Sequence, residues 1–545
     1  MKMKIFRRII AFLTVLVCTA GVCSIGVSAA VIEEDAVSSD TQNIQLYTTD
    51  STLPSSYSSK DLGYVTEIKS QLHNDCWGYA GLATYESMLL RNGFQVESMS
   101  VDHLNAWATT RSNNTGWIRN YVGDGYASIT LGYLTAWQGG VSLSDAGKID
   151  FSADVKGDLV ATDLAKYGVT AVEFLSKENP DAIKRQIMKN GGVYSSYATV
   201  SSCFNKLRTA YYMPESYSGT STGHAIEIVG WDDNYSASNF TGTIGAKPSS
   251  SGAWLAKNSW GDYNTLGGYF WISYEDKYIF SQKYKPSYSI KDVQVIDENV
   301  KLVQNEIFGA TYEFGYVDEE EITYLNKFDF TDEYSNLDKV IFETSCLNAD
   351  YTIHYVPTVN DEPVPDKSKW TQLYSGVADY NGYICADIED FELPEGMGAI
   401  AITIDTSRVN EGLSSGDEGY VSNKIGVGEW LVSSSGSYVF INDSEYGDSY
   451  IYYDNTMTDL LDWYEANLGD ELGGTFVIKA VTTKSNLLGD VNLDGVLNIE
   501  DATEIQKHLA EKVTFTDTSK ANADFNRDGM ISILDATEVQ KYIVR

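Results

Sequence analysis

The chain has 545 residues, which suggests about three domains at roughly 100–200 residues each. Its formal net charge is −37, and this acidity argues against nucleic acid and anionic membrane as the main partners, because phosphate binding requires clustered Lys and Arg. The hydrophobic fraction of 43% permits large packed cores, and the 38 tyrosines favour β-rich surfaces over helical bundles.

Residues 1–30 have the pattern of a secretory signal peptide. Four basic residues precede the apolar stretch 9–17, and the small residues 27–29 offer a cleavage site. The alternative, a retained membrane anchor, is disfavoured because the apolar stretch is short for a span. We therefore expect a secreted, extracellular protein with no membrane span after signal removal. Residues 31–52 are acidic and rich in Ser and Thr, and are predicted to be a linker or short pro-segment.

The block 53–284 opens with a helical pattern and closes with strands. Apolar residues between 76 and 92 recur close to helical spacing, and a second helix is expected at 181–189. The runs 225–229 and 269–273 indicate strands. Helices followed by strands predict an α+β fold for this block.

Six cysteines are present, and two of them lie in the signal segment. The remaining four are too few for a disulfide framework across the exported chain. A bridge between Cys346 and Cys385 is left open. Cys203 has no distinguishing context, whereas Cys76 stands where the first helix should begin.

Cys76 is the candidate nucleophile, because the free N–H groups and dipole of a helix N-terminus favour the reactive thiolate. Such a thiol also needs a base, a group that orients the base, and oxyanion donors. His224 precedes a predicted strand, and Asn258 could hold its imidazole. Gln71 lies upstream of Cys76, where its amide could serve an oxyanion. His73 is nearer in sequence than His224, but is read as a surface loop residue.

Four segments in this order resemble the papain family of cysteine proteases over residues 53–284. His224 follows Cys76 by about 150 residues, the wide spacing typical of that family. The matching segments are the start of the block (53–66), the nucleophile segment (71–80), the histidine strand (223–230) and the asparagine loop (257–261).

The resemblance implies that Cys76 is the nucleophile, His224 the general base and later acid, Asn258 the orienting residue and Gln71 an oxyanion donor. Trp260 could cover the bond between His224 and Asn258 from water. A weaker match relates residues 123–126, Gly-Asp-Gly-Tyr, to the glycine-rich wall of the family's substrate cleft.

Three departures from the family stand out. The segment from Gln71 to Cys76 is one residue shorter than usual, which affects the reach of the glutamine. The partner cysteines of plant and animal members are missing. Residues 31–52 are too short for a long inhibitory pro-domain, so zymogen control by a folded pro-domain is not expected.

Residues 288–484 are predicted to form an all-β sandwich. Short alternating or apolar runs recur between polar turn clusters, at 339–342, 351–355, 398–404 and 475–478. In position, size and strand pattern the block resembles the lectin-like domain that follows some bacterial papain-like domains. Trp370, Trp430 and Trp463 could stack on carbohydrate, but packing within the sandwich is the favoured interpretation.

The segment 489–545 contains two acidic twelve-residue loops, 490–501 and 524–535. Calcium takes six to eight oxygen ligands, and such loops provide them at positions 1, 3, 5, 7 and 12. Each loop is therefore predicted to bind one Ca²⁺. The candidate ligands are Asp490, Asn492, Asp494, Val496 and Asp501 in the first loop, and Asp524, Asn526, Asp528, Met530 and Asp535 in the second.

Each loop leads into a nearly identical helical sequence, at 501–508 and 535–542, and the pair resembles a dockerin. That resemblance implies folding on calcium and binding to a cohesin domain of a scaffold protein. Ile533 and Leu534 are either partner contacts or residues that pack against the other helix, and both alternatives remain open.

Together these features predict a multidomain chain: an α+β papain-like protease, an all-β lectin-like sandwich and a small all-α calcium-binding dockerin. We expect a cysteine endopeptidase that hydrolyses peptide bonds through a thioester and is docked on a cellulosome-type, polysaccharide-degrading complex. The alternatives are a catalytically silent binding or adhesion component with a papain fold, and an exopeptidase. The expected partners are a protein or peptide substrate, a cohesin, and carbohydrate if the sandwich binds sugar.

Overall fold

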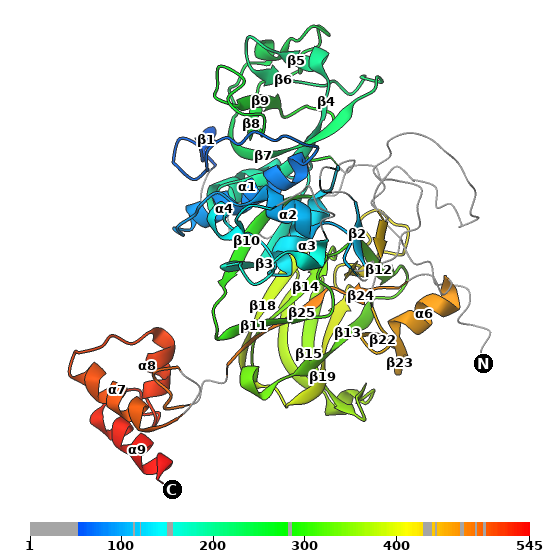
Figure 1. Ribbon diagram of the computed structural model, residues 1–545. Coiled ribbons are helices and arrows are strands. Elements are labelled where there is room, and N and C mark those ends of the chain that lie inside the picture. The colour runs from blue at the N-terminus through cyan, green and yellow to red at the C-terminus, as the bar shows by residue number, and fades with distance from the viewer. Residues whose placement is uncertain are drawn as a thin grey trace.

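The chain forms an α+β region, a β-rich region and a small group of helices, which Figure 1 shows at the top, below it and apart at the lower left. The predicted signal peptide and linker lie outside the residues that the structure describes. This computed structural model describes residues 53–544 apart from 113–114, 120, 122, 150–155, 282–285, 429–438, 442–443, 469–472, 485–487 and 494–496. Within these residues no helix is long and apolar enough to cross a membrane.

Helix α1 (Cys76–Arg91) is the central helix of the first region, and it begins at the cysteine as its apolar spacing predicted. Helices α2 (Val101–Trp107) and α3 (Ala127–Thr135) contact it. Gly81 permits the close approach of α1 to α3, because a Cβ at this position would lie 2.5 Å from Cγ2 of Thr130. The three helices share an apolar core that includes Leu82, Tyr85, Leu104, Trp107 and Leu134.

The other half of the first region is an antiparallel sheet. Its central strands, in spatial order, are β4 (Val193–Thr199), β7 (Thr222–Asp232), β8 (Ala253–Lys257) and β9 (Tyr269–Ser273). The strands expected at 225–229 and 269–273 are thus present as β7 and β9. The helix expected at 181–189 is α5 (Pro180–Asn190), which starts at a proline and is capped by the Asn179 side chain.

The second region is the predicted β-sandwich. One layer is built around β15 (Asp350–Val359), β19 (Gly396–Asp405) and β13 (Glu321–Phe330), which are neighbours in a seven-stranded sheet. The facing layer contains β11 (Val300–Gln304), β25 (Ile478–Thr483), β14 (Asn336–Thr344) and β18 (Gly382–Glu392). Side chains of both layers fill one core, among them Ile353, Ile402, Phe342, Ile384 and Ile478.

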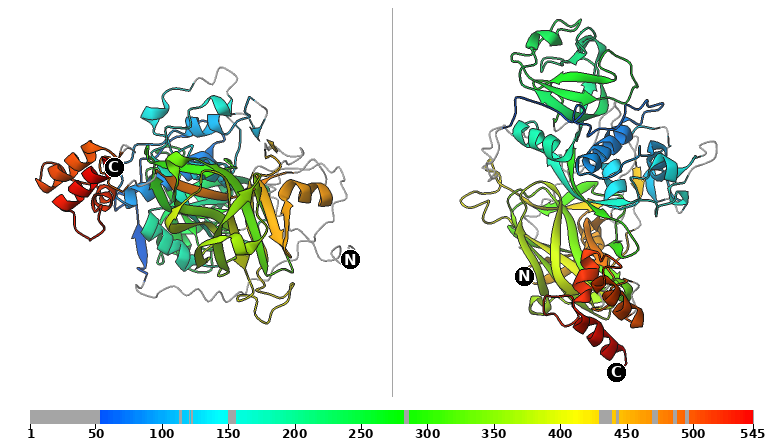
Figure 2. Two further views of the ribbon diagram at one scale, coloured as in Figure 1. Left: turned by 90° about the horizontal axis from the view of Figure 1, so that it is seen from below. Right: turned by 90° about the vertical axis from the view of Figure 1, so that its left-hand side faces the viewer.

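The two regions share one continuous sheet, which the sequence pattern did not predict. Strand β18 of the sandwich pairs with β3 (Tyr167–Leu175), and β3 pairs with β10 (Ser287–Val295). Strand β10 in turn contacts β4, so the hydrogen-bonded path runs from the sandwich into the protease sheet. The right-hand view of Figure 2 shows the same two regions stacked end to end. Strand periodicity identifies strands but not their partners, so this continuity could not be read from the sequence.

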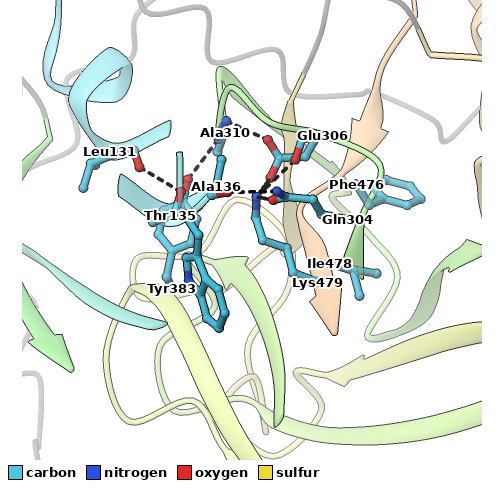
Figure 3. Close-up of polar contacts among 12 residues, drawn as sticks. Leu131, Thr135, Ala136, Gln304, Glu306, Ala310, Tyr383, Phe476, Ile478 and Lys479 are labelled. Carbon is cyan, nitrogen blue, oxygen red and sulfur yellow. Dashed lines mark hydrogen bonds and ion pairs between the residues drawn. The ribbon is translucent and has the colours of Figure 1, made fainter. Parts of the chain in front are cut away.

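A buried ion pair lies at this joint (Figure 3). Lys479 on β25 and Glu306 form a salt bridge, and both side chains have no exposed surface. The Lys479 ammonium also donates to Oε1 of Gln304 at 2.6 Å, and the Gln304 amide donates to the carbonyl of Ala136 in the protease at 3.0 Å. Gln304 thus links the buried ion pair of the sandwich to a backbone carbonyl of the protease.

The third region contains α7 (Ile499–Leu509), α8 (Asp517–Ala523) and α9 (Ile533–Ile543), and so is all-α as predicted. Helices α7 and α9 begin with equivalent capping boxes, Asn498 with Asp501 and Ser532 with Asp535. Helix α8 was not predicted, because its small polar sequence has no apolar periodicity. The core is small and consists of Val491, Ala502, Ile505, Phe515, Ala523, Ala536 and Val539.

Candidate active site

Cys76 is the first residue of α1 and is partly exposed. Its thiol therefore lies beside the free N–H groups at the positive end of a sixteen-residue helix. Burial nevertheless raises the pKa of the Cys76 thiol to about 11, and a hydrogen bond from the backbone of Ala225 lowers it in part. The resting thiol thus needs a base to remove its proton.

His224 and Asn258 meet as the sequence predicted. Nε2 of His224 lies 2.8 Å from Oδ1 of Asn258, and both residues are buried. The backbone N–H of Ser259 donates to the same Oδ1 at 2.8 Å, while the Asn258 amide donates to the Tyr263 hydroxyl at 3.1 Å. Since Oδ1 only accepts, Nε2 carries the proton of the neutral imidazole, and Nδ1 is left as the basic nitrogen.

The surroundings of His224 are aromatic and dry. The Trp260 ring stacks on the imidazole at a centroid distance of 4.5 Å, and Tyr197 contacts it edge-on at 5.8 Å. Burial lowers the pKa of His224 to about 4, and the hydrogen bond to Asn258 raises it in part. The imidazole is therefore neutral near pH 7 and able to accept a proton.

Gln71 lies next to the asparagine loop, but its amide is engaged. Its Nε2 donates to the carbonyl of His73 at 2.8 Å, and its Oε1 accepts from the Ser259 hydroxyl at 2.6 Å. Its backbone N–H also donates to the Ser259 carbonyl at 2.7 Å. The shortened segment before Cys76 thus turns the glutamine amide onto its own loop. His73 itself is exposed, as expected for a surface residue.

The loop 123–126 contacts the nucleophile segment. A Cβ at Gly125 would lie 2.4 Å from Cε2 of Trp77, the residue after Cys76, so only glycine fits there without a shift. Arg119 also covers Trp77, with its guanidinium carbon 4.9 Å from the ring centroid. Sequence reasoning missed Arg119 and Tyr197, because neither stands in a motif that marks it as a neighbour of the site.

A cavity and two buried ion pairs lie directly behind the asparagine. Glu227 of β7 pairs with Lys257 of β8 at 3.4 Å, and these residues are direct cross-strand neighbours. Lys69 pairs with the fully buried Glu86 of α1 at 2.5 Å. The cavity is lined by Lys69, Glu227, Lys257 and Asn258, among others. The Thr66 hydroxyl links the two pairs, because it accepts from Lys257 at 3.1 Å and donates to Glu86.

The predicted calcium loops are described in part. Asp494 and Val496 of the first loop lie outside the described residues, whereas Asp490, Asn492 and Asp501 lie within them. Asp501 and Asp535, at the last position of each loop, are fully buried. In the second loop Asp524 accepts the N–H groups of Asp528 and Gly529 at 3.0 and 2.8 Å, Asn526 also accepts the N–H of Asp528, and Asp528 accepts that of Met530.

The donor set of these loops suits calcium, because carboxylate, amide and main-chain oxygens are what this hard cation prefers. Among the residues that the structure describes, no three His, Cys, Asp or Glu side chains converge closely enough to hold a metal by themselves. Amide and main-chain oxygens, such as those of Asn526 and Met530, would have to complete the coordination.

Trp370 and Trp463 are buried in the sandwich, which agrees with packing rather than sugar stacking, and Trp430 lies outside the described residues. Ile533 and Leu534 are 57% and 60% exposed, so they do not pack against the other helix. All four described cysteines are free, so Cys346 and Cys385 form no bridge.

Family models match three successive parts of the chain. Residues 53–290 match the papain family cysteine protease model, 302–482 the lectin like domain, and 488–544 the dockerin type I domain. No curated protein matches the chain.

Solved structures give a longer match. The clostridial cysteine protease Cwp84 after propeptide cleavage is 32% identical, with a TM-score of 0.67 over 79% of this chain and 100% of that chain. The cysteine protease and lectin-like domains of Cwp84, a surface layer associated protein of Clostridium difficile, give 32% identity and a TM-score of 0.67 over 80% of this chain and 89% of that one. The chain therefore belongs to the papain family of cysteine proteases, and it is a cysteine peptidase that carries a lectin-like domain and a dockerin domain.

Proposed function

We propose that the chain is an endopeptidase that uses Cys76, His224 and Asn258 and is held on a scaffold protein by its dockerin. The observation that carries the catalytic part is the 2.8 Å contact between His224 Nε2 and Asn258 Oδ1, which leaves Nδ1 as the base. The same strand brings the backbone of the next residue, Ala225, to the Cys76 sulfur.

The reaction follows from these positions. His224 Nδ1 takes the thiol proton as Cys76 Sγ attacks the carbonyl carbon of the scissile peptide bond. The imidazolium then gives that proton to the leaving amine, the C–N bond breaks, and a thioester remains. Water, deprotonated by His224, attacks the thioester and releases the acid and the free thiol. Asn258 holds the imidazole in one tautomer throughout.

The oxyanion of each tetrahedral intermediate requires preorganised donors. The free backbone N–H of Cys76 at the start of α1 supplies one donor. Gln71 supplies the second after its amide exchanges the His73 carbonyl for the oxyanion. The bond from the Ser259 hydroxyl holds the other end of the glutamine amide during that exchange.

The dockerin part of the proposal rests on its two loops and its exposed helix residues. Each loop would hold one Ca²⁺ through the ligands named above, and binding would supply the positive charge that buried Asp501 and Asp535 need. The exposed apolar residues Ile533 and Leu534, together with Ile499, would contact the cohesin. Secretion through the predicted signal peptide 1–30 would place the enzyme on an extracellular, cellulosome-type complex.

The test is hydrolysis of a mixed peptide library by the chain from residue 31, in reductant, against Cys76→Ala. Internal cleavage by the wild type alone supports the endopeptidase, and terminal trimming alone would replace it with an exopeptidase. No cleavage by the folded, reduced wild type would favour the silent binding component. His224→Ala should lose hydrolysis to a similar extent, because triad members act as a unit.

A further inference from the structure

Arg119 is a buried charged residue beside the candidate active site. It follows strand β2 (Gly116–Ile118) and is only 8% exposed. Its guanidinium donates hydrogen bonds to the carbonyls of Gly123 (2.6 Å), Asp124 (3.1 Å), Ala108 (3.1 Å) and Asn105 (3.4 Å), and to Oδ1 of Asn105 (3.3 Å). A buried arginine whose donors meet backbone carbonyls fixes the course of those backbones.

Two of these carbonyls belong to the loop that contacts Trp77. Arg119 donates to the carbonyls of Gly123 and Asp124, and the next residue of the loop, Gly125, packs closely against the indole. The guanidinium lies over the same indole, at a distance where a cation–π contact contributes. The loop is thus held to the residue that follows the nucleophile.

A second route leads from Arg119 to the residue before the nucleophile. Oδ1 of Asn105 accepts from Arg119, and the amide of Asn105 donates to Oδ2 of Asp75 at 3.1 Å. Asp75 is buried and directly precedes Cys76. Arg119 therefore contacts the nucleophile segment on both sides of Cys76, once through Trp77 and once through Asn105.

The lectin-like domain contacts the strand that precedes Arg119. Strand β2 pairs with β21 (Val439–Ile441), which comes from the sandwich, with Trp117 opposite Phe440 and Ile118 opposite Val439. The backbone immediately before Arg119 is therefore held by the neighbouring domain. No described cysteine forms a disulfide that could hold the 123–126 loop instead.

We propose that Arg119 is a positioning residue of the peptidase, which clamps the 123–126 loop against Trp77 and so shapes the substrate-binding surface beside Cys76. The lectin-like domain supports this clamp through β21, which pairs with the strand before Arg119. The inference rests on the proposed function, because it assumes that peptide substrates lie along this loop.

The test compares Arg119→Met and Arg119→Lys with Arg91→Met in the full chain. Arg91 is a matched control, since it also lies over an aromatic ring (Tyr64, 4.9 Å) and donates to a backbone carbonyl (Met188, 2.9 Å), but at the far end of α1. The readouts are kcat and KM for a long peptide, the rate of Cys76 alkylation by iodoacetamide, and hydrogen exchange of the 123–126 amides.

In Arg119→Met we expect kcat/KM to fall on the order of 10²-fold, mainly through KM, because small misplacements of a binding surface have effects of this size. Arg119→Lys should recover part of the loss, and Arg91→Met should remain near wild type. Alkylation by the small reagent should change much less than hydrolysis. Exchange of the 123–126 amides should quicken in Arg119→Met alone.

Several results would overturn the clamp. Wild-type KM in folded Arg119→Met would do so, as would an equal loss in Arg91→Met, which would indicate general destabilisation. Failure of the proposed function is distinguishable: the wild type would then cleave no peptide, while the exchange of the 123–126 amides would still report whether Arg119 holds the loop. Unchanged exchange in Arg119→Met would contradict the clamp independently of activity.

Discussion

The joint between protease and sandwich and the dockerin both bury charge, but they differ in the origin of the counter-charge. At the joint, Glu306 and Lys479 are fully buried and neutralise each other (Figure 3). In the dockerin, Asp501 and Asp535 are equally buried and accept backbone N–H groups, among them those of Val491 and Asn526. We propose that calcium provides the positive charge there. The joint then needs only charged groups of the chain itself, whereas the dockerin depends on calcium from the solution.

Removal of calcium should therefore have the largest effect, and it should affect the dockerin but not the protease and sandwich. At a free concentration 100 times its dissociation constant, a ligand stabilises the folded state by about 2.7 kcal/mol per site. Calcium in two loops would together stabilise the folded dockerin by about as much as the roughly 3–5 kcal/mol that so small a core provides. We expect EGTA to abolish binding to an immobilised cohesin while leaving peptide hydrolysis unchanged.

All 11 tryptophans lie before residue 489, so tryptophan fluorescence reports the protease and sandwich and not the dockerin. It should not respond to EGTA. Asp535→Asn should weaken calcium-dependent cohesin binding in the same manner. Loss of hydrolysis on chelation, reversed by calcium, would show that the protease also depends on the metal and would contradict the separation.

The second effect tests the joint. Lys479→Met leaves Glu306 buried without its counter-charge, and breaking a buried pair in this way costs about 3–5 kcal/mol. The measurement is urea unfolding followed by tryptophan fluorescence. The matched control is Lys367→Met in the sandwich, where the exposed pair with Glu321 contributes about 1 kcal/mol or less.

The double variant Lys479→Met with Glu306→Gln should recover part of the lost stability, since no uncompensated charge remains. An unfolding midpoint for Lys479→Met equal to that of the wild type would mean that the ion pair does not contribute to the stability of the joint.

The sequence predicted the elements better than their connections. Helix α1 and strands β7 and β9 follow from apolar spacing, because local periodicity reflects burial. Helices α7 and α9 follow from the repeated sequence after the two acidic loops. The continuity of β18 with β3 could not follow from it, since strand pairing joins residues far apart in the chain. Motifs singled out Cys76, His224 and Asn258 as candidates, whereas Arg119 donates to backbone carbonyls, which leave no mark in the sequence.

The next effect is the pH dependence of hydrolysis, which comes from the protease alone. Burial lowers the pKa of His224 to about 4 and raises the pKa of Cys76 to about 11. The pair that holds one proton is the active form, and it exists between these two values. We expect kcat/KM for an uncharged substrate to rise with pH through about 4, tenfold per unit below it, and to stay flat through neutrality.

The same profile should be obtained with and without calcium, which sharpens the contrast between the regions. An acid limb centred above pH 6 would contradict it, because His224 would then be protonated far more readily than a buried imidazole should be. In that case the ring would be better solvated than its contacts with Trp260 and Tyr197 indicate.

The smallest effect concerns Trp260, which is itself 39% exposed but covers the imidazole of His224. Trp260→Leu removes the ring and admits water to the bond between His224 and Asn258. A hydrogen bond in water is weaker than one in a dry site, so the imidazole loses part of its orientation. We expect kcat to fall by a few fold, about 1 kcal/mol, with the acid limb moved upward because the better hydrated imidazolium forms more easily.

The control is Trp370→Leu in the sandwich, which removes a ring that contacts His354 and should leave kcat and the profile unchanged. An unchanged acid limb in Trp260→Leu would mean that the neighbouring strands, rather than the indole, keep the imidazole dry.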